Sequence, residues 1–291
     1  MGGMGGMGGM GGGPQQYGPQ QLAAAIAASL TLSGPDPPPP PPSLAAPARV
    51  KRWGDGLDAP AAGARHFVPQ GFEVTLDVPE AIARFGHSAS HIAQIMAAGR
   101  AKASASIHPT YAAALYAYTE ESPLYGTLNY TMRTPHTPST PTDTELKHYA
   151  DYLTHLCSAL GSLPTHVSES KGKVYRGIKV LLNPDIYATG RRITWQAFSS
   201  STRKQMATLE FVNNLPGRKL QGSLFVIDSK TAKDIRHFSA IPDEEEVLFP
   251  PNSQFMVQRV VTSEQEKKAL LNQLGAYIMT DLDVYVLEQI A

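Results

Sequence analysis

The sequence predicts an α+β fold: a helical N-terminal half packed on a mostly antiparallel β-sandwich, with a disordered tail in front. Apolar residues recur at helical spacing over residues 79–163. From residue 173 onward, short β-branched and aromatic runs are divided by Gly, Pro, Asn and Asp, which is typical of strands. We expect a tail over residues 1–62 and one domain over 63–291, helical to residue 170 and β-rich from residue 171.

The tail has too little apolar surface to offset the entropy lost on ordering, so we expect it to stay unfolded. It opens with Met-Gly-Gly repeats and contains the run Pro37–Pro42, which is either an extended spacer or a docking segment for an aromatic groove. In an Ala-rich island, Leu22, Ala25 and Ser29 match a ubiquitin-interacting motif that lacks its acidic cluster. A weak ubiquitin-type contact and a plain helical patch both remain open.

The helical half contains one segment with complete start and stop signals. It opens with the capping box Thr142-Asp143-Thr144-Glu145, and Gly161 and Pro164 mark its end. Its apolar stripe consists of Leu146, Tyr149, Leu153, Leu156 and Leu160. Other helices are expected over Pro79–Met96, over Tyr111–Tyr118 after a Thr110 cap, and over Thr127–Met132.

The second half should consist mainly of strands, with two helical inserts between them. The strands are expected over Lys173–Leu181, Thr194–Ser199, Gly222–Asp228, Glu245–Phe249, Gln254–Thr262 and Asp283–Leu287, and the inserts over Arg203–Asn213 and Ser263–Leu274.

Composition excludes several classes of function. Lys+Arg and Asp+Glu are balanced at 25 each, so no basic field favours nucleic acid. The single cysteine, Cys157, excludes a disulfide framework and reads as a buried thiol. His87 and His91 lie four residues apart without a third ligand, so no metal site is predicted. No segment is long enough to span a membrane and no conventional signal peptide is evident, so we expect an intracellular protein.

An acidic run that enters a strand is the centre of the candidate site. Asp243-Glu244-Glu245-Glu246 leads directly into Val247-Leu248-Phe249-Pro250. Because a strand alternates its faces, Glu244 and Glu246 should point the same way and Glu245 the opposite way. Two carboxylates on one face can divide acid and base work.

Two other strands carry residues that suit such a pair. Arg176 lies inside the strand Val174-Tyr175-Arg176-Gly177, as an edge residue or as a clamp for a phosphate or carboxylate. Gly177 would let a ligand approach the backbone. The cluster Ser199-Ser200-Ser201-Thr202 caps the next helix or fixes a catalytic carboxylate.

The order strand Arg, strand Ser, then Glu-x-Glu resembles the arginine-specific mono-ADP-ribosyltransferases of the R-S-E group. The resemblance runs from about Ala112 to the C-terminus. Its segments are Leu115-Tyr116-Ala117-Tyr118-Thr119, Leu124-Tyr125-Gly126-Thr127-Leu128-Asn129, Val174-Tyr175-Arg176-Gly177-Ile178 and Glu244-Glu245-Glu246-Val247-Leu248-Phe249-Pro250.

The resemblance implies the ADP-ribosyltransferase fold and a role for each matching residue. Arg176, with Gly177, would hold NAD+ (or NADP+) as co-substrate, and no metal is implied. Ser200 would begin the Ser-Thr-Ser motif, which reads Ser-Ser-Thr here, with Ser201 also at the cofactor. Glu246 would be the catalytic Glu and Glu244 the first Glu of Glu-x-Glu, which binds the acceptor arginine. In the recognition loop Arg236–Ala240, Phe238 would be the aromatic that contacts substrate.

These roles agree with the chemistry, because breaking the nicotinamide–ribose bond creates a cationic centre that a carboxylate stabilises. The expected function is transfer of ADP-ribose from NAD+ to an arginine of an acceptor protein. Two alternatives remain open: an NAD glycohydrolase, and a catalytically silent binding module of the same fold.

Overall fold

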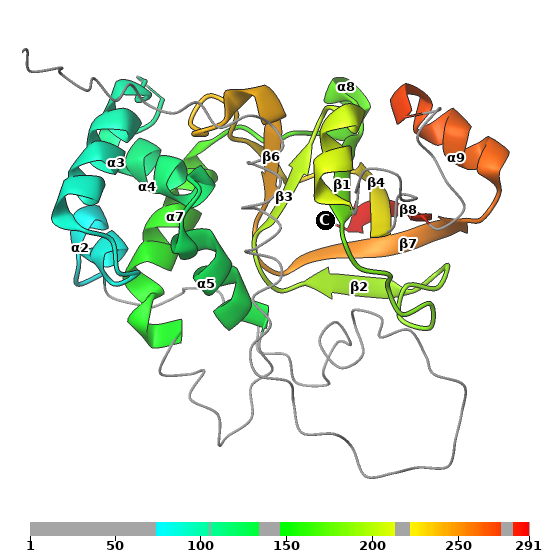
Figure 1. The fold of residues 1–291 in the computed structure, drawn as a ribbon, viewed down its shortest axis with the longest axis horizontal. Helices are drawn as coiled ribbons and strands as arrows, with labels where there is room; N and C mark the ends of the chain where they lie inside the picture. The colour runs from blue at the N-terminus through cyan, green and yellow to red at the C-terminus, as the bar shows by residue number, and fades with distance from the viewer. Residues whose placement is uncertain (1–73, 105, 134–145, 213–221, 275–281, 291) are drawn as a thin grey trace, which may run out of the picture.

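A computed structural model describes residues 74–104, 106–133, 146–212, 222–274 and 282–290 (Figure 1). The predicted tail, its ubiquitin-type island and the capping box Thr142–Glu145 lie outside these residues. Within them the chain is α+β, as the sequence predicts: helices α2 to α7 gather beside a single sheet of eight strands (Figure 1).

The helices begin where short polar side chains cap them. Asp77 and Glu80 form a capping box at the start of the first helix, and Ser88 caps the second. Gly86, with φ of +81°, separates these two helices, so the single helix expected over Pro79–Met96 is wrong. The next helix is capped by His108 and not by Thr110. The helices are α2 (Val78–Ala83), α3 (Ala89–Ala101), α4 (Pro109–Thr119), α5 (Pro123–Arg133), α7 (Ala150–Ser162) and α8 (Ser168–Lys171).

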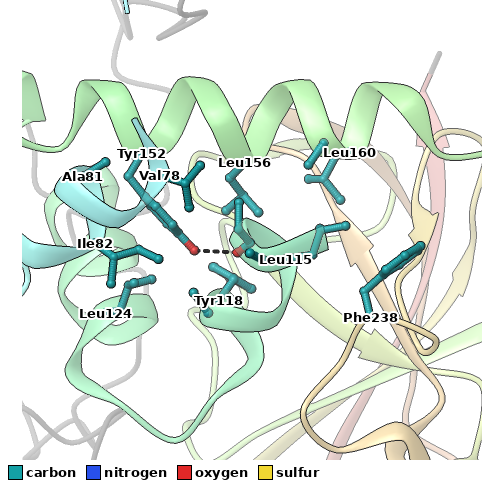
Figure 2. Close-up of a cluster of buried hydrophobic side chains, with 14 of the residues drawn as sticks. Val78, Ala81, Ile82, Leu115, Tyr118, Leu124, Tyr152, Leu156, Leu160 and Phe238 are labelled. Carbon is teal, nitrogen blue, oxygen red and sulfur yellow. Dashed lines mark hydrogen bonds between the residues drawn. The ribbon is translucent and has the colours of Figure 1, made fainter. Parts of the chain in front are cut away.

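The helical layer has its own hydrophobic core (Figure 2). The predicted α7 stripe contributes Leu153, Leu156 and Leu160, which are almost completely buried. Tyr152 is buried as well, and its hydroxyl donates a hydrogen bond of 2.8 Å to the carbonyl of Ala114 on α4. Gly99 lets α3 and α4 cross closely, because a Cβ at this position would lie 2.2 Å from the Cα of Ala113.

The sheet has the strand order β2-β7-β8-β4-β1-β3-β6-β5, and its pairs are antiparallel except for β4 with β8. The predicted strand Thr194–Ser199 is in fact two strands with different partners, since β2 pairs with β7 and β3 with β6. The strands are β1 (Val174–Ile178), β2 (Arg192–Trp195), β3 (Ser199–Thr202), β4 (Gly222–Asp228), β5 (Lys233–Asp234), β6 (Glu246–Phe249), β7 (Ser253–Val261) and β8 (Leu282–Ile290).

The sheet curls so that its two ends share one core, which gives it the sandwich character expected from the sequence. The Trp195 ring on β2 lies 5.8 Å from that of Phe249 on β6, although the two strands stand near opposite ends of the sheet order. On β4, Phe225 and Ile227 enter this inner core, whereas Leu224 enters a second cluster on the other face. The second cluster is covered by the inserts η1 (Gln205–Phe211), α9 (Glu264–Leu270) and η3 (Asn272–Leu274).

Candidate active site

Arg176, Ser200 and Glu246 lie on three neighbouring strands. β3 stands between β1 and β6, with Tyr175 opposite Thr202 and Thr202 opposite Glu246. The guanidinium of Arg176 donates a hydrogen bond from Nη1 to the carbonyl of Ser200. The sheet therefore brings together three residues that are tens of positions apart in the sequence.

Glu246 is a buried carboxyl group, with only 5% of the residue exposed. Burial raises its pKa to about 7, against the hydrogen bond from Ser200 and the charge of Arg176, which both lower it. A carboxyl group with a pKa near neutrality changes its charge in the range where most enzymes work.

Glu244 is the second carboxyl group of the site, but it does not lie in the strand. It ends the short 3-10 turn η2 (Pro242–Glu244), Glu245 follows in the left-handed conformation with φ of 47°, and β6 begins only at Glu246. The strand alternation expected over Glu245–Phe249 is therefore not what separates the three carboxylates.

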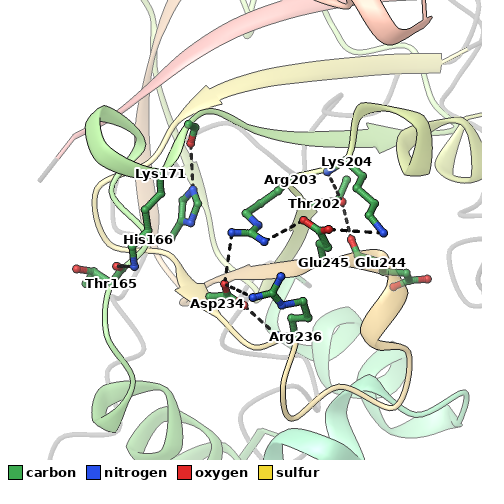
Figure 3. A network of polar contacts seen from close by, with 11 residues as sticks. Thr165, His166, Lys171, Thr202, Arg203, Lys204, Asp234, Arg236, Glu244 and Glu245 are labelled. Atoms are coloured by element: carbon green, nitrogen blue, oxygen red, sulfur yellow. Dashed lines mark hydrogen bonds and ion pairs between the residues drawn. The ribbon is translucent and has the colours of Figure 1, made fainter.

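The electrostatics nevertheless couple Glu244 to Glu246. Burial, followed by the charges of Glu246, Glu210 and Glu121, raises the pKa of Glu244 to about 8. Its Oε1 atom is buried and has no hydrogen-bond partner among the described residues. Glu245 instead bonds Arg203 at 2.9 Å, so its carboxylate serves a different contact (Figure 3).

Arg176 is a half-buried cation that no carboxylate of the described residues pairs with in a salt bridge. Burial, and then the charge of Arg133, lowers its pKa to about 10, so it stays protonated at neutral pH. Its guanidinium carbon lies 5.6 Å from the centre of the Trp195 ring. A fixed guanidinium with unused donors suits the pyrophosphate of a dinucleotide, so the residues present fit NAD.

Other parts of the chain approach the backbone closely at Gly177. A Cβ at this position would lie 2.6 Å from the carbonyl oxygen of Thr208 and 3.1 Å from Cβ of Phe211, both in η1. A glycine is therefore needed here for the protein's own packing, and the approach of a ligand to its backbone stays a prediction.

Ser201 is separated from Ser200. Its register partner is Val247, whose side chain belongs to the inner sandwich core, whereas Leu248, opposite Ser200, packs in the helical core. Ser201 is 3% exposed, and its hydroxyl has no partner among the described residues. The two serines thus face opposite sides of the sheet, and Ser200 alone bonds Glu246.

Phe238 also lies elsewhere than expected. The residue is 5% exposed and packs with the hydrophobic core of the helical layer (Figure 2). The same loop is fixed to the helices by polar contacts: Nζ of Lys102 donates to the carbonyl of His237 at 3.4 Å, and the Ala240 amide donates to Oγ1 of Thr119 at 2.8 Å. The Phe238 ring therefore anchors the loop to the helical layer, and its expected contact with a substrate stays a prediction.

Two residues near the carboxylates were not assigned a role from the sequence. Tyr118 on α4 is buried close enough to Glu246 and Arg176 for their charges to act on its pKa, which burial raises strongly. Nδ2 of Asn129 on α5 donates to the Tyr118 hydroxyl at 2.8 Å. Both residues belong to the segments that carry the family resemblance, and that was the signal available for them.

His87, just before the Ser88 cap of α3, and His91, in the first turn of that helix, contact each other. Nδ1 of His87 and Nδ1 of His91 share a hydrogen bond of 3.0 Å, and Nε2 of His91 contacts Glu120 at 2.7 Å. Within the described ranges no group of three or more His, Cys, Asp or Glu residues could hold a metal ion. No helix in the same ranges is long and apolar enough to cross a membrane.

The fold, together with the meeting of Arg176, Ser200 and Glu246 on neighbouring strands, points to the ADP-ribosyltransferase class. Residues 83–277 match the family NAD:arginine ADP-ribosyltransferase, which is more than half of the chain. The chain belongs to this family, and the resemblance recognised in the sequence is confirmed.

The individual proteins that resemble this chain share a third or less of its residues over the matched lengths. The mouse protein named GPI-linked NAD(P)(+)–arginine ADP-ribosyltransferase 1 is 31% identical over 147 residues, which is 50% of this chain and 41% of the relative. The chain therefore spans about two fifths of that protein's length. Among solved structures, ADP-ribosyltransferase HopU1 of Pseudomonas syringae pv. Tomato DC3000 is 22% identical with a TM-score of 0.49, over 80% of this chain and 91% of its own. ADP-ribosyltransferase Vis of Vibrio splendidus, solved with agmatine, is 19% identical with a TM-score of 0.46, over 73% and 90%.

Proposed function

We propose that this protein transfers ADP-ribose from NAD+ to the arginine side chain of an acceptor protein and releases nicotinamide. The observation that carries the proposal is the coupled pair of carboxyl groups, the buried Glu246 and the half-buried Glu244, beside the protonated Arg176. Membership of the arginine ADP-ribosyltransferase family and the 31% identical relative support it.

Each residue has a task that its environment suits. Arg176 binds the pyrophosphate and fixes the donor. Ser200 orients Glu246, whose carboxylate stabilises the positive charge that develops on the ribose as its bond to nicotinamide breaks. Removing a stabilising group of this kind costs about 10²–10³-fold in rate.

Glu244 completes the transfer. Its carboxylate binds the acceptor guanidinium, a nitrogen of which forms the new bond to the ribose carbon, and it takes the proton that this nitrogen loses. Arginine holds its protons strongly, so transfer depends on Glu244 being ionised. The Oε1 atom of Glu244 has no hydrogen-bond partner among the described residues, so no such bond within them has to break before it accepts one from the acceptor arginine.

Hydrolysis of NAD+ is the second candidate, and the raised pKa of Glu244 favours it. With a pKa of about 8, Glu244 is mostly protonated at pH 7 and then cannot receive the proton from arginine. Water then competes for the same cationic centre. The proportion of NAD+ used for transfer should therefore rise as the pH increases through 8.

The test is incubation with labelled NAD+ and agmatine, followed by separation of labelled agmatine from free ADP-ribose. Wild-type protein should label agmatine, Glu246→Gln should lose both products, and Glu244→Gln should retain hydrolysis while losing transfer. Glu264→Gln, on α9, is the matched control. Free ADP-ribose alone from wild-type protein would point to the glycohydrolase. Neither product, together with no NAD+ binding, would support the silent binding module.

Three further expectations belong to this proposal. The partner is an acceptor protein with a reactive arginine. The proposed turnover needs no metal, so EDTA should leave it unchanged, and NADP+ is the alternative donor to compare.

An intracellular site of action is proposed from the lone Cys157, whose thiol pKa burial raises to about 12. Recovery of the protein from the culture medium of its cells would contradict that location.

A further inference from the structure

The residue between the two site carboxylates has an unusual backbone. Glu245 has φ of 47° and ψ of 51°, the left-handed conformation that glycine and asparagine tolerate best. Among the residues that the structure describes, Asn252 is the only other non-glycine residue with positive φ. This conformation joins the η2 turn to β6, and so sets where Glu244 lies relative to Glu246.

The backbone on both sides of Glu245 is held at four successive carbonyl groups. The carbonyl of Asp243 accepts a bond of 2.8 Å from Lys204 Nζ, and that of Glu244 accepts one of 2.6 Å from Thr202 Oγ1. The carbonyls of Glu245 and Glu246 accept bonds from the amides of Arg203 and Ile235, at 3.3 and 3.1 Å. Three of the four donors are the consecutive residues 202–204, which begin two positions after Ser200.

The side chain of Glu245 also contacts two of the residues that hold its backbone, Arg203 and Lys204 (Figure 3). Its Oε2 lies 2.9 Å from Nη2 of Arg203, and its Oε1 lies 3.6 Å from Nζ of Lys204. Arg203 is held in turn by Asp234 at 3.9 Å, which also lies 3.9 Å from Arg236. Two cations thus draw the middle side chain away from the site while its neighbours Glu244 and Glu246 remain coupled to each other.

We propose that Arg203 and Lys204, acting through Glu245, are positioning residues that hold Glu244 where it meets the acceptor arginine. The inference rests on the proposed transferase function and assigns residues to it. Glu246 is fixed independently, by its place in β6 and by Ser200. Loss of the Glu245 contacts should therefore affect the acceptor step more than the cleavage of NAD+.

If Arg203 and Glu245 served only the stability of the fold, their loss would reduce transfer and NAD+ hydrolysis equally. The Arg203 and Glu245 side chains are 27% and 25% exposed, and ion pairs of this exposure contribute little to stability because water screens them. Variants at these positions should fold, which allows the positioning role to be measured.

The experiment compares Glu245→Ala, Glu245→Gly and Arg203→Ala in the full-length protein, with labelled NAD+ and agmatine. Glu245→Ala keeps the steric cost of the left-handed conformation but removes the contacts with Arg203 and Lys204 that offset it. Transfer kcat/KM for agmatine should therefore fall about tenfold, as for about 1.4 kcal/mol of barrier. NAD+ hydrolysis should change by less than about twofold. Glu245→Gly loses the same ion pair but adopts the conformation freely, so it should recover a large part of the transfer. Lys173→Ala, which breaks the distant 2.9 Å pair with Asp228, is the control and should match wild type.

The outcomes separate the positioning role from general damage to the site and from failure of the proposed transferase function. Equal loss of transfer and hydrolysis in Glu245→Ala would indicate damage to the whole site and overturn the positioning role. Equal transfer by the Ala and Gly variants would overturn the role of the left-handed backbone, and normal transfer by Arg203→Ala would overturn that of the cation. Wild-type protein that hydrolyses NAD+ without labelling agmatine would overturn the proposed function itself, and this inference with it.

Discussion

Replacing Glu246 by Gln should stabilise the protein at alkaline pH, because keeping an ionised carboxylate at this buried position costs free energy of folding. The pKa of Glu246 rises from the ordinary 4.5 to about 7 in the folded state, since burial disfavours its charged form. The folded protein therefore binds this proton more tightly than the unfolded chain does. Stability from this group is fully present below pH 4.5 and is lost as the pH rises from 4.5 to about 7.

The size of the effect follows from the pKa difference. At about 1.4 kcal/mol for each pH decade between the two pKa values, ionising Glu246 costs the fold about 3 kcal/mol above pH 7. This value already contains the attraction of Arg176 and the Ser200 bond, which oppose the effect of burial. Gln keeps the shape and an acceptor for Ser200 without the charge. For a domain of about this length, that free energy corresponds to a rise in Tm of about 6–12 °C.

Thermal unfolding at pH 5.0 and pH 8.5, followed by circular dichroism, measures this directly. The gain in Tm of Glu246→Gln over wild type should reach its full size at pH 8.5 and shrink to a small fraction at pH 5.0, where the folded carboxyl is protonated anyway. Glu264→Gln should show no such dependence on pH. A gain that is equal at the two pH values, or a variant less stable than wild type at pH 8.5, would refute the reasoning.

Three further predictions test the site, the helical layer and the domain limits. NAD+ turnover by transfer should rise between about pH 6 and 8.5 and then level off, because Glu246 and Glu244 act as carboxylates with pKa values of about 7 and 8; a flat profile would contradict this. Gly99→Ala should cost about 2 kcal/mol in urea unfolding, because its Cβ would lie 2.2 Å from a Cα of α4, while Gly161→Ala, with nothing within 4 Å, should not destabilise. Removing residues 1–62 should leave NAD+ turnover intact, because every proposed site residue lies later in the chain; lost turnover would move the domain boundary.

Local patterns in the sequence predicted the type of most described elements. The run Gly222–Asp228 is the strand β4 with the expected bounds, because its apolar residues serve both faces of a central strand. The α7 stripe predicted the buried face of that helix, since helical periodicity is a property of neighbouring residues.

Features that depend on distant partners were not predictable. Thr194–Ser199 reads as one strand, but Trp195 pairs with β7 and Ser199 with β6, so the chain changes partner between them. A glutamate gives no local signal for a left-handed backbone, and the conformation of Glu245 depends on Arg203 and Lys204. An aromatic residue in a loop faces either solvent or a core, and the core that takes Phe238 is built largely from helices α2 to α7, which lie far before it in the chain.

The position of β8 has a consequence for how the protein is made. This strand, Leu282–Ile290, lies between β7 and β4 in the sheet, yet it follows every proposed site residue in the chain. Because the ribosome adds residues in chain order, Glu246 is already part of the nascent chain when β8 is still unsynthesised. Until then β4 lacks its parallel neighbour, and the inner core lacks Tyr285 and Leu287. The nascent chain thus carries all of its proposed site residues before it has the sheet that assembles them, so we expect activity to begin only after β8 has left the exit tunnel.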